Sequence, residues 1–177
     1  MRKVVAILLL VLSFFIIYFI QSNFFTWFTI AGIQPNIFVI YILFIGLFAG
    51  KKIGIILGII FGFYIDLVIG RQIGISGIML GLIGLIGEIL DKNFSKESRI
   101  TIMLMMATCT VIYELGCYLF NVVTLDVNLE IISFIKILIL ETIYNLIITI
   151  IIYPLMQNLG HLLEETFKAK KILTRYF

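Results

Sequence analysis

A ladder of small residues at every fourth position runs through the most apolar part of the chain. Its glycines are Gly46, Gly50, Gly54, Gly58, Gly62, Gly70 and Gly74. Asp66 takes the one place in the ladder that has no glycine. In water each glycine would destabilise a helix by about 1 kcal/mol relative to alanine, whereas in lipid this spacing lets two helix backbones approach closely. The ladder therefore predicts closely packed helices in a membrane.

The composition also places the chain among membrane proteins. Its 177 residues are 62% hydrophobic and 13% charged, with a mean hydropathy of +1.20, and a soluble domain of this length cannot hide so much apolar surface. We predict an all-α polytopic membrane protein with six transmembrane helices in a single membrane domain. The predicted spans are residues 4–20, 36–50, 53–69, 73–90, 100–123 and 131–156.

The basic residues predict the orientation of these spans. With a cytoplasmic N-terminus, all 13 lysines and arginines except Arg71 and Lys136 fall on the cytoplasmic side. This is the positive-inside pattern for an even number of crossings, so we expect both termini in the cytoplasm. Residues 159–177 are predicted to form a cytoplasmic amphipathic, basic tail. The apolar face of this tail consists of Leu159, Leu162, Leu163 and Phe167.

Besides Glu88, which lies at the inner end of its span, four charged residues lie inside the predicted spans. Asp66, Glu114 and Lys136 fall at a similar depth if each helical residue advances about 1.5 Å. A charge at a helix centre costs about 2.5–3.5 kcal/mol on insertion scales, so we expect Lys136 to contact Asp66 or Glu114. Glu141 completes this predicted buried charge cluster. The cluster could fix helix register, form a proton or ion pathway, or contact a partner's transmembrane helix, and the first alternative is favoured.

The sequence lacks three common motifs of soluble enzymes. It has no phosphate-binding G-x-x-x-x-G-K-[ST] loop, no H-E-x-x-H motif and no nucleophile elbow. His161 is its only histidine, so a histidine-cluster metal site cannot form within one chain. We therefore expect neither an enzyme nor a cofactor, and no nucleic-acid partner.

Several short motifs resemble a known family. Pro35-Asn36 opens a short apolar segment, Asp66-x-x-x-Gly70-x-x-x-Gly74 ends the glycine-rich span, and Tyr144-Asn145 precedes Tyr153-Pro154-Leu155 in the last span. In order and spacing they resemble MreD, the rod shape-determining membrane protein of bacteria. The family-motif residues are Pro35, Asn36, Asp66, Gly70, Gly74, Asn145 and Pro154. The family commonly has an acid where this chain has Asn36, so the resemblance carries no charged role to that position.

The resemblance implies a non-enzymatic scaffold of the cell-elongation and peptidoglycan-synthesis machinery in the bacterial plasma membrane. It implies a fold similar to that of the substrate-binding subunits of energy-coupling-factor transporters. It also implies binding to the bitopic protein MreC within the membrane. Through MreC, the implied indirect partners are RodA, a penicillin-binding protein and MreB.

The alternative function is a substrate-binding subunit of an energy-coupling-factor vitamin transporter. Such a subunit should have a ligand pocket with polar side chains in its outer loops, whereas the outer connections here are short or aromatic. We therefore favour the scaffold and expect a surface for a partner helix instead of a ligand pocket. The candidate partner-helix and packing surface consists of Gly54, Gly58, Gly62, Asp66, Gly70, Gly74, Gly77 and Gly81.

Overall fold

The computed structural model of the chain describes residues 2–69, 73–94, 96, 98–125 and 130–168. These residues form six α-helices and one short π-helix, and they contain no β-strand longer than an isolated bridge, which confirms the all-α class. The elements are α1 (Arg2–Phe19), the π-helix η1 (Ile20–Phe24), α2 (Ile37–Ala49), α3 (Lys51–Ile69), α4 (Ile75–Asn93), α5 (Arg99–Leu125) and α6 (Ile131–Phe167).

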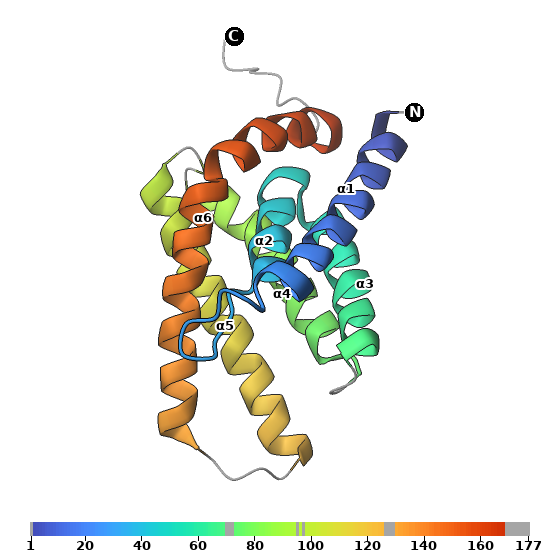
Figure 1. The fold of residues 1–177 in the computed structure, drawn as a ribbon. Coiled ribbons are helices and arrows are strands. Elements are labelled where there is room, and N and C mark those ends of the chain that lie inside the picture. The colour runs from blue at the N-terminus through green and yellow to red at the C-terminus, as the bar shows by residue number, and fades with distance from the viewer. Residues whose placement is uncertain (1, 70–72, 95, 97, 126–129, 169–177) are drawn as a thin grey trace.

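Four segments are long and apolar enough to cross a membrane. They are Lys3–Phe24, Lys51–Ile69, Arg99–Thr124 and Ile131–Phe167. The prediction of six spans is thus confirmed only in part, because the described residues form six α-helices and four segments satisfy the length and composition of a span. The protein is a multi-pass membrane protein. Helix α1 begins and α6 ends at one end of the molecule, the termini end. Helices α3 and α5 end, and α4 and α6 begin, toward the other end, the hairpin end (Figure 1).

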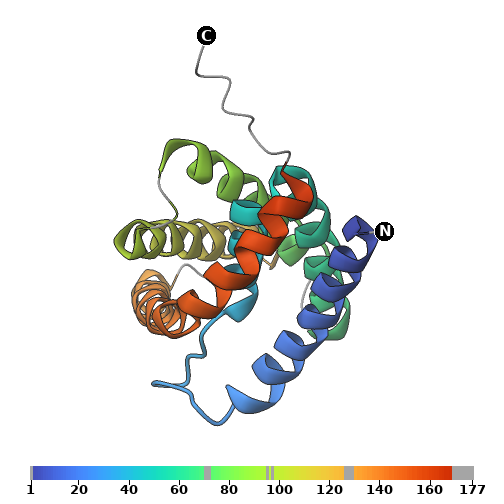
Figure 2. The same ribbon diagram turned by 90° about the horizontal axis from the view of Figure 1, so that it is seen from above.

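Helix α2 is the central helix of the fold. It has 13 residues, all of them buried, so at about 1.5 Å per residue it extends only about 20 Å and is shorter than the apolar core of a bilayer. The side chains of α2 itself are apolar on every face of the helix, which is typical of a helix enclosed by others. In both views it lies within the ring formed by the other helices (Figures 1 and 2).

The glycines of α3 and α4 bring these two helices into backbone contact. A Cβ atom at Gly62 would lie 2.4 Å from the carbonyl oxygen of Ser76, and one at Gly84 would lie 2.3 Å from the carbonyl group of Gly54. Gly46 of α2 approaches the same region, because its Cβ would lie 2.5 Å from the Gly84 oxygen. Only a hydrogen side chain fits at such distances, so the glycines fix the packing of three helices.

Helix α6 continues beyond the predicted end of the last span. It runs through Pro154 to Phe167 and bends near the proline, so that its last turns cross the termini end of the molecule (Figure 1). A proline inside a helix removes one backbone hydrogen bond and produces such a bend. Gly160 then packs on Phe48, whose ring would lie 2.6 Å from a Cβ atom at this glycine. The part of the predicted tail after residue 168 lies outside the described residues.

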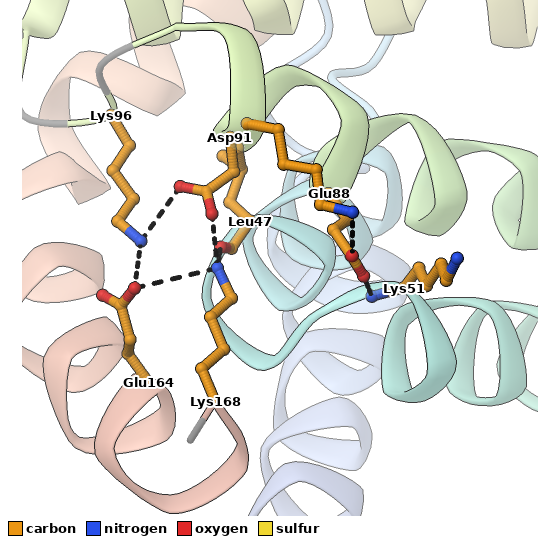
Figure 3. Close-up of polar contacts among 8 residues, drawn as sticks. Leu47, Lys51, Glu88, Asp91, Lys96, Glu164 and Lys168 are labelled. Carbon is orange, nitrogen blue, oxygen red and sulfur yellow. Dashed lines mark hydrogen bonds and ion pairs between the residues drawn. The ribbon is translucent and has the colours of Figure 1, made fainter. Parts of the chain in front are cut away.

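An ionic network holds the last turn of α6 in place (Figure 3). Lys96 lies 3.0 Å from Asp91 and 2.7 Å from Glu164, and Lys168 lies 2.5 Å from Asp91. Lys168 also donates to the carbonyl oxygen of Leu47, near the end of α2. Burial alone would lower the pKa of Lys96, but its hydrogen bonds and attraction to Glu164 and Asp91 outweigh burial and raise it. The network therefore joins α6 to α4 and to the central helix.

Candidate functional site

A cavity of about 590 Å³ lies at the hairpin end of the bundle. Its walls come from the connection between α1 and α2, from the facing ends of α3 and α4, and from α5 and α6. The polar side chains that line it include Gln21, Ser22, Thr26, Gln34, Asn36, Asp66, Ser76, Tyr113, Glu114, Tyr118, Asn121 and Glu141. Polar groups from four helices and one connection thus converge on a single space.

Asp66 closes the α3–α4 hairpin beside this cavity. Its side chain is only 6% exposed, and its Oδ2 atom accepts hydrogen bonds from the backbone N–H groups of Gly74 (2.8 Å) and Ser76 (3.0 Å). Gly74 is the N-cap of α4 and has a φ of +102°, a left-handed conformation that favours glycine. Donors at a helix N-terminus stabilise a carboxylate. The charge of Asp66 is therefore compensated by the start of α4.

A second set of hydrogen bonds fixes the start of α2. The N–H group of Asn36 donates to Oδ1 of Asn145 at 2.7 Å, and Nδ2 of Asn145 donates to the Thr110 hydroxyl at 3.1 Å. Gln21 donates to the carbonyl oxygen of Pro35 at 2.8 Å and accepts from the N–H group of Ile37 at 3.1 Å. These bonds connect the adjacent family-motif residues Pro35 and Asn36 to a network that includes Asn145, which lies 109 positions after Asn36 in the sequence.

Glu114 of α5 and Glu141 of α6 lie side by side in the cavity wall and interact electrostatically. Glu141 is only 7% exposed, and its Oε1 atom is buried without a hydrogen-bond partner among the described residues. Glu114 is partly exposed. The two carboxyl groups thus form a close pair in a region of low dielectric constant.

The structure contradicts the predicted contact between Lys136 and the buried acids. The Lys136 side chain is exposed, and no ion pair formed within the described ranges includes it. At about 100° of turn per residue, five positions place Lys136 about 140° around α6 from Glu141, so the two cannot face the same neighbours. Of the four residues in the predicted buried charge cluster, Asp66, Glu114 and Glu141 line the cavity and Lys136 does not.

Five glycines of the candidate partner-helix and packing surface face neighbouring helices of the chain itself and not a free surface. Gly54, Gly58, Gly62, Gly77 and Gly81 are buried in the contact between α3 and α4. Their bare backbones are covered by each other, which leaves no room for a partner helix on that face. Gly70 lies outside the described residues, and Pro154 lies at the bend of α6.

The cavity itself corrects the expectation that the outer connections hold no polar pocket. Gln21, Ser22, Thr26 and Gln34 line it from the connection between α1 and α2. Sequence analysis missed these residues because the aromatic residues among them dominate the pattern. Phe25 is only 7% exposed and packs edge-on against Tyr144 at 6.3 Å. This contact ties the connection to α6 and holds the polar side chains over the cavity.

A second, apolar groove of about 1190 Å³ runs between α1 and α6, with α2 as its floor. The view from above shows the last part of α6 crossing over α2 and α1 standing at the side (Figure 2). The groove is lined almost entirely by aliphatic and aromatic side chains, among them Leu9, Ile16, Phe44, Ile151 and Leu155. Several of these side chains are more than half exposed, including Leu9 at 60% and Ile151 at 67%.

Comparison with known proteins identifies the family. The family model of the rod shape-determining protein MreD matches residues 1–162 of the chain, from the start of α1 into the last turns of α6. No curated protein and no solved structure matches it. The match covers every residue that lines the polar cavity and all the residues that line the apolar groove except Leu163 and Thr166. Together with the apolar helices of the fold, it shows that the chain belongs to the MreD family of rod shape-determining membrane proteins.

Proposed function

We propose that this protein is a non-enzymatic membrane scaffold of the machinery that elongates rod-shaped cells, and that it binds the bitopic protein MreC within the membrane. Its indirect partners would be RodA, a penicillin-binding protein and MreB. The family match supports a role in rod shape. The observation that supports a partner helix is the apolar groove between α1 and α6.

The groove suits a single transmembrane helix for two reasons. Its floor is the buried helix α2, and its walls are the apolar sides of α1 and α6, so its lining matches the side chains of a membrane span. Helix α1 also packs loosely, because only 11% of its most apolar stretch is buried within the molecule. In lipid, helices associate through close packing of complementary surfaces. A helix in this groove would cover apolar surface on three helices at once.

Site-specific photo-crosslinking tests this proposal. Crosslinkers at Leu9, Ile16 and Ile151 face the groove and are expected to capture MreC in cells. Crosslinkers at Ile60 of α3 and Leu104 of α5, which are also exposed but lie outside the groove, provide the controls. Capture at the control positions and not in the groove would exclude the groove as the binding site.

The same groove can be tested by cell shape. Ile16→Trp and Ile151→Trp fill the groove and are expected to leave cells round or swollen when they replace the native protein. Ile60→Trp adds the same side chain outside the groove and should maintain rods. Rods with all three variants, at equal membrane levels of protein, would contradict the scaffold proposal.

The polar cavity favours a second candidate, the substrate-binding subunit of an energy-coupling-factor vitamin transporter. Such a subunit needs a polar ligand pocket at one end of its bundle, and the cavity has this character. The fold similarity to these subunits stays a prediction. Normal rods after depletion of the protein, together with specific vitamin binding by the purified protein, would favour this candidate over the scaffold.

We also propose that both termini are cytoplasmic, which places the hairpin end and its cavity on the outer side. The distribution of basic residues supports this orientation. Reporter fusions after Gln21, Arg71 and Asp126 are expected to report the outside, and a fusion after Lys96 the cytoplasm. A cytoplasmic signal from the fusion at Arg71 would show that α3 and α4 do not cross the membrane in the proposed direction, and it would contradict the proposed orientation.

A further inference from the structure

The carboxyl pair in the polar cavity has no described cation beside it. Glu141 lines the cavity, is only 7% exposed, and leaves its Oε1 atom without a hydrogen-bond partner in the described part of the chain. Burying a carboxyl group without a compensating partner is unfavourable. The neighbouring Glu114 is a second acid, which repels a carboxylate at Glu141. Among the described residues, the pair therefore lacks a compensating positive charge, and its Oε1 atom on Glu141 lacks a hydrogen-bond donor.

Among the polar groups nearby, the Asn36 side chain interacts with Glu141 but brings no positive charge. Asp66 is an acid that is already satisfied by the N-terminus of α4, and Lys136 is exposed on another face of α6. The hydroxyl of Tyr118, which also lines the cavity, is buried without a partner among the residues that the structure describes. Polar atoms without hydrogen-bond partners in the described part of the chain, one on α5 and one on α6, thus border the cavity.

The size and lining of the cavity indicate the chemical class of ligand. A volume of about 590 Å³ is in the range of small-molecule sites, about 300–1,000 Å³, and exceeds what a bare ion needs. The described residues contain no group of three acidic, histidine or cysteine side chains that could hold a metal ion. Apolar side chains such as Phe38, Ile65 and Phe134 line the cavity beside the polar ones. Such walls suit the carbon chain of an organic cation.

We propose that this cavity binds a small organic cation through a primary ammonium or guanidinium group placed between Glu114 and Glu141. Glu114 is the less buried carboxyl and meets the incoming cation first, and Glu141 holds it at the inner end. The N–H donors of either group pair with carboxylate oxygens in charge-assisted hydrogen bonds, while the apolar walls cover the carbon chain. This site is separate from the apolar groove and does not depend on partner binding there.

Calorimetric titration of the full chain in detergent tests the proposal with n-butylammonium and n-butylguanidinium chloride as probes. Both are expected to bind, and n-butanol and tetramethylammonium chloride are not, because the first lacks the charge and the second lacks N–H donors. Glu141→Gln and Glu114→Gln should each weaken binding by about tenfold or more. Glu130→Gln, at an exposed acid at the start of α6, should bind like the native chain.

The thermal stability of the free variants separates binding from a structural role. If Glu141 serves a ligand, Glu141→Gln should retain or raise the unfolding temperature, because it removes a buried acid that only cation binding requires. Glu114→Gln, at a partly exposed position, provides the same comparison should Glu141→Gln fail to fold. Absence of probe binding to the native chain would overturn the proposal, and so would binding to both glutamine variants that is as tight as binding to the native chain.

The same chemistry could come from a free amine or from a basic side chain of another protein. A capped peptide whose only charge is one arginine distinguishes these sources. Tighter binding of this peptide than of n-butylguanidinium would indicate a partner's side chain, and binding of the free probes alone would indicate a small molecule. Either result supports a cation site, whereas failure of groove crosslinking would affect only the proposed scaffold function.

Discussion

Alanine at Gly62 or Gly84 is expected to destabilise this protein strongly, although it adds only one methyl group. The new Cβ atom would lie 2.4 Å from the Ser76 oxygen at position 62 and 2.3 Å from the Gly54 carbonyl at position 84. Backbone atoms cannot move aside as the end of a side chain can, so α3 and α4 must separate. Overpacking of this kind costs about 1–3 kcal/mol or more per site. Unfolding temperature and folded yield in detergent measure the effect.

The matched control is the same substitution at Gly81, in the same pair of helices. There the nearest obstacle to a Cβ atom is a side-chain atom, Cγ1 of Ile59 at 2.8 Å, instead of backbone, and the Ile59 residue is 47% exposed. Gly81→Ala should therefore cost much less than either of the other two changes. Equal losses at Gly62, Gly81 and Gly84 would show that close backbone contact is not what holds α3 against α4.

Asp66→Ala is expected to be the most damaging change of an acid in the protein. It removes the acceptor for two backbone N–H groups, those of Gly74 and Ser76, at the start of α4. An unsatisfied buried donor costs about 1–3 kcal/mol, so the loss at this one residue should reach a few kcal/mol. The variant should unfold at a lower temperature and give a lower folded yield than the native chain.

Asp66→Asn separates the hydrogen bonds from the charge. Asparagine retains one oxygen that can accept from Gly74 or Ser76, so this variant should lose less stability than Asp66→Ala. If Asp66 acted mainly through its charge, the two variants would be equally unstable. That result would contradict its assignment as the cap of α4.

The sequence alone determined the class of fold and the family. The ladder of glycines in apolar segments predicted closely packed membrane helices, and the motifs around Asp66 and Asn145 predicted the family that the match over residues 1–162 confirms. These features are readable because they are local. Helix periodicity and glycine spacing depend on neighbouring residues, and lipid tolerates few alternatives to a helix.

Only the tertiary structure decided which neighbours each residue meets. It turned the glycines of α3 and α4 toward each other, enclosed α2, which the sequence had suggested as a full span, and gave Asp66 the start of α4 as its partner. Depth along a helix follows from residue number, and depth alone predicted a contact with Lys136. The direction of a side chain around its helix depends on how all the helices pack, and that packing left Lys136 exposed and brought Glu114 beside Glu141.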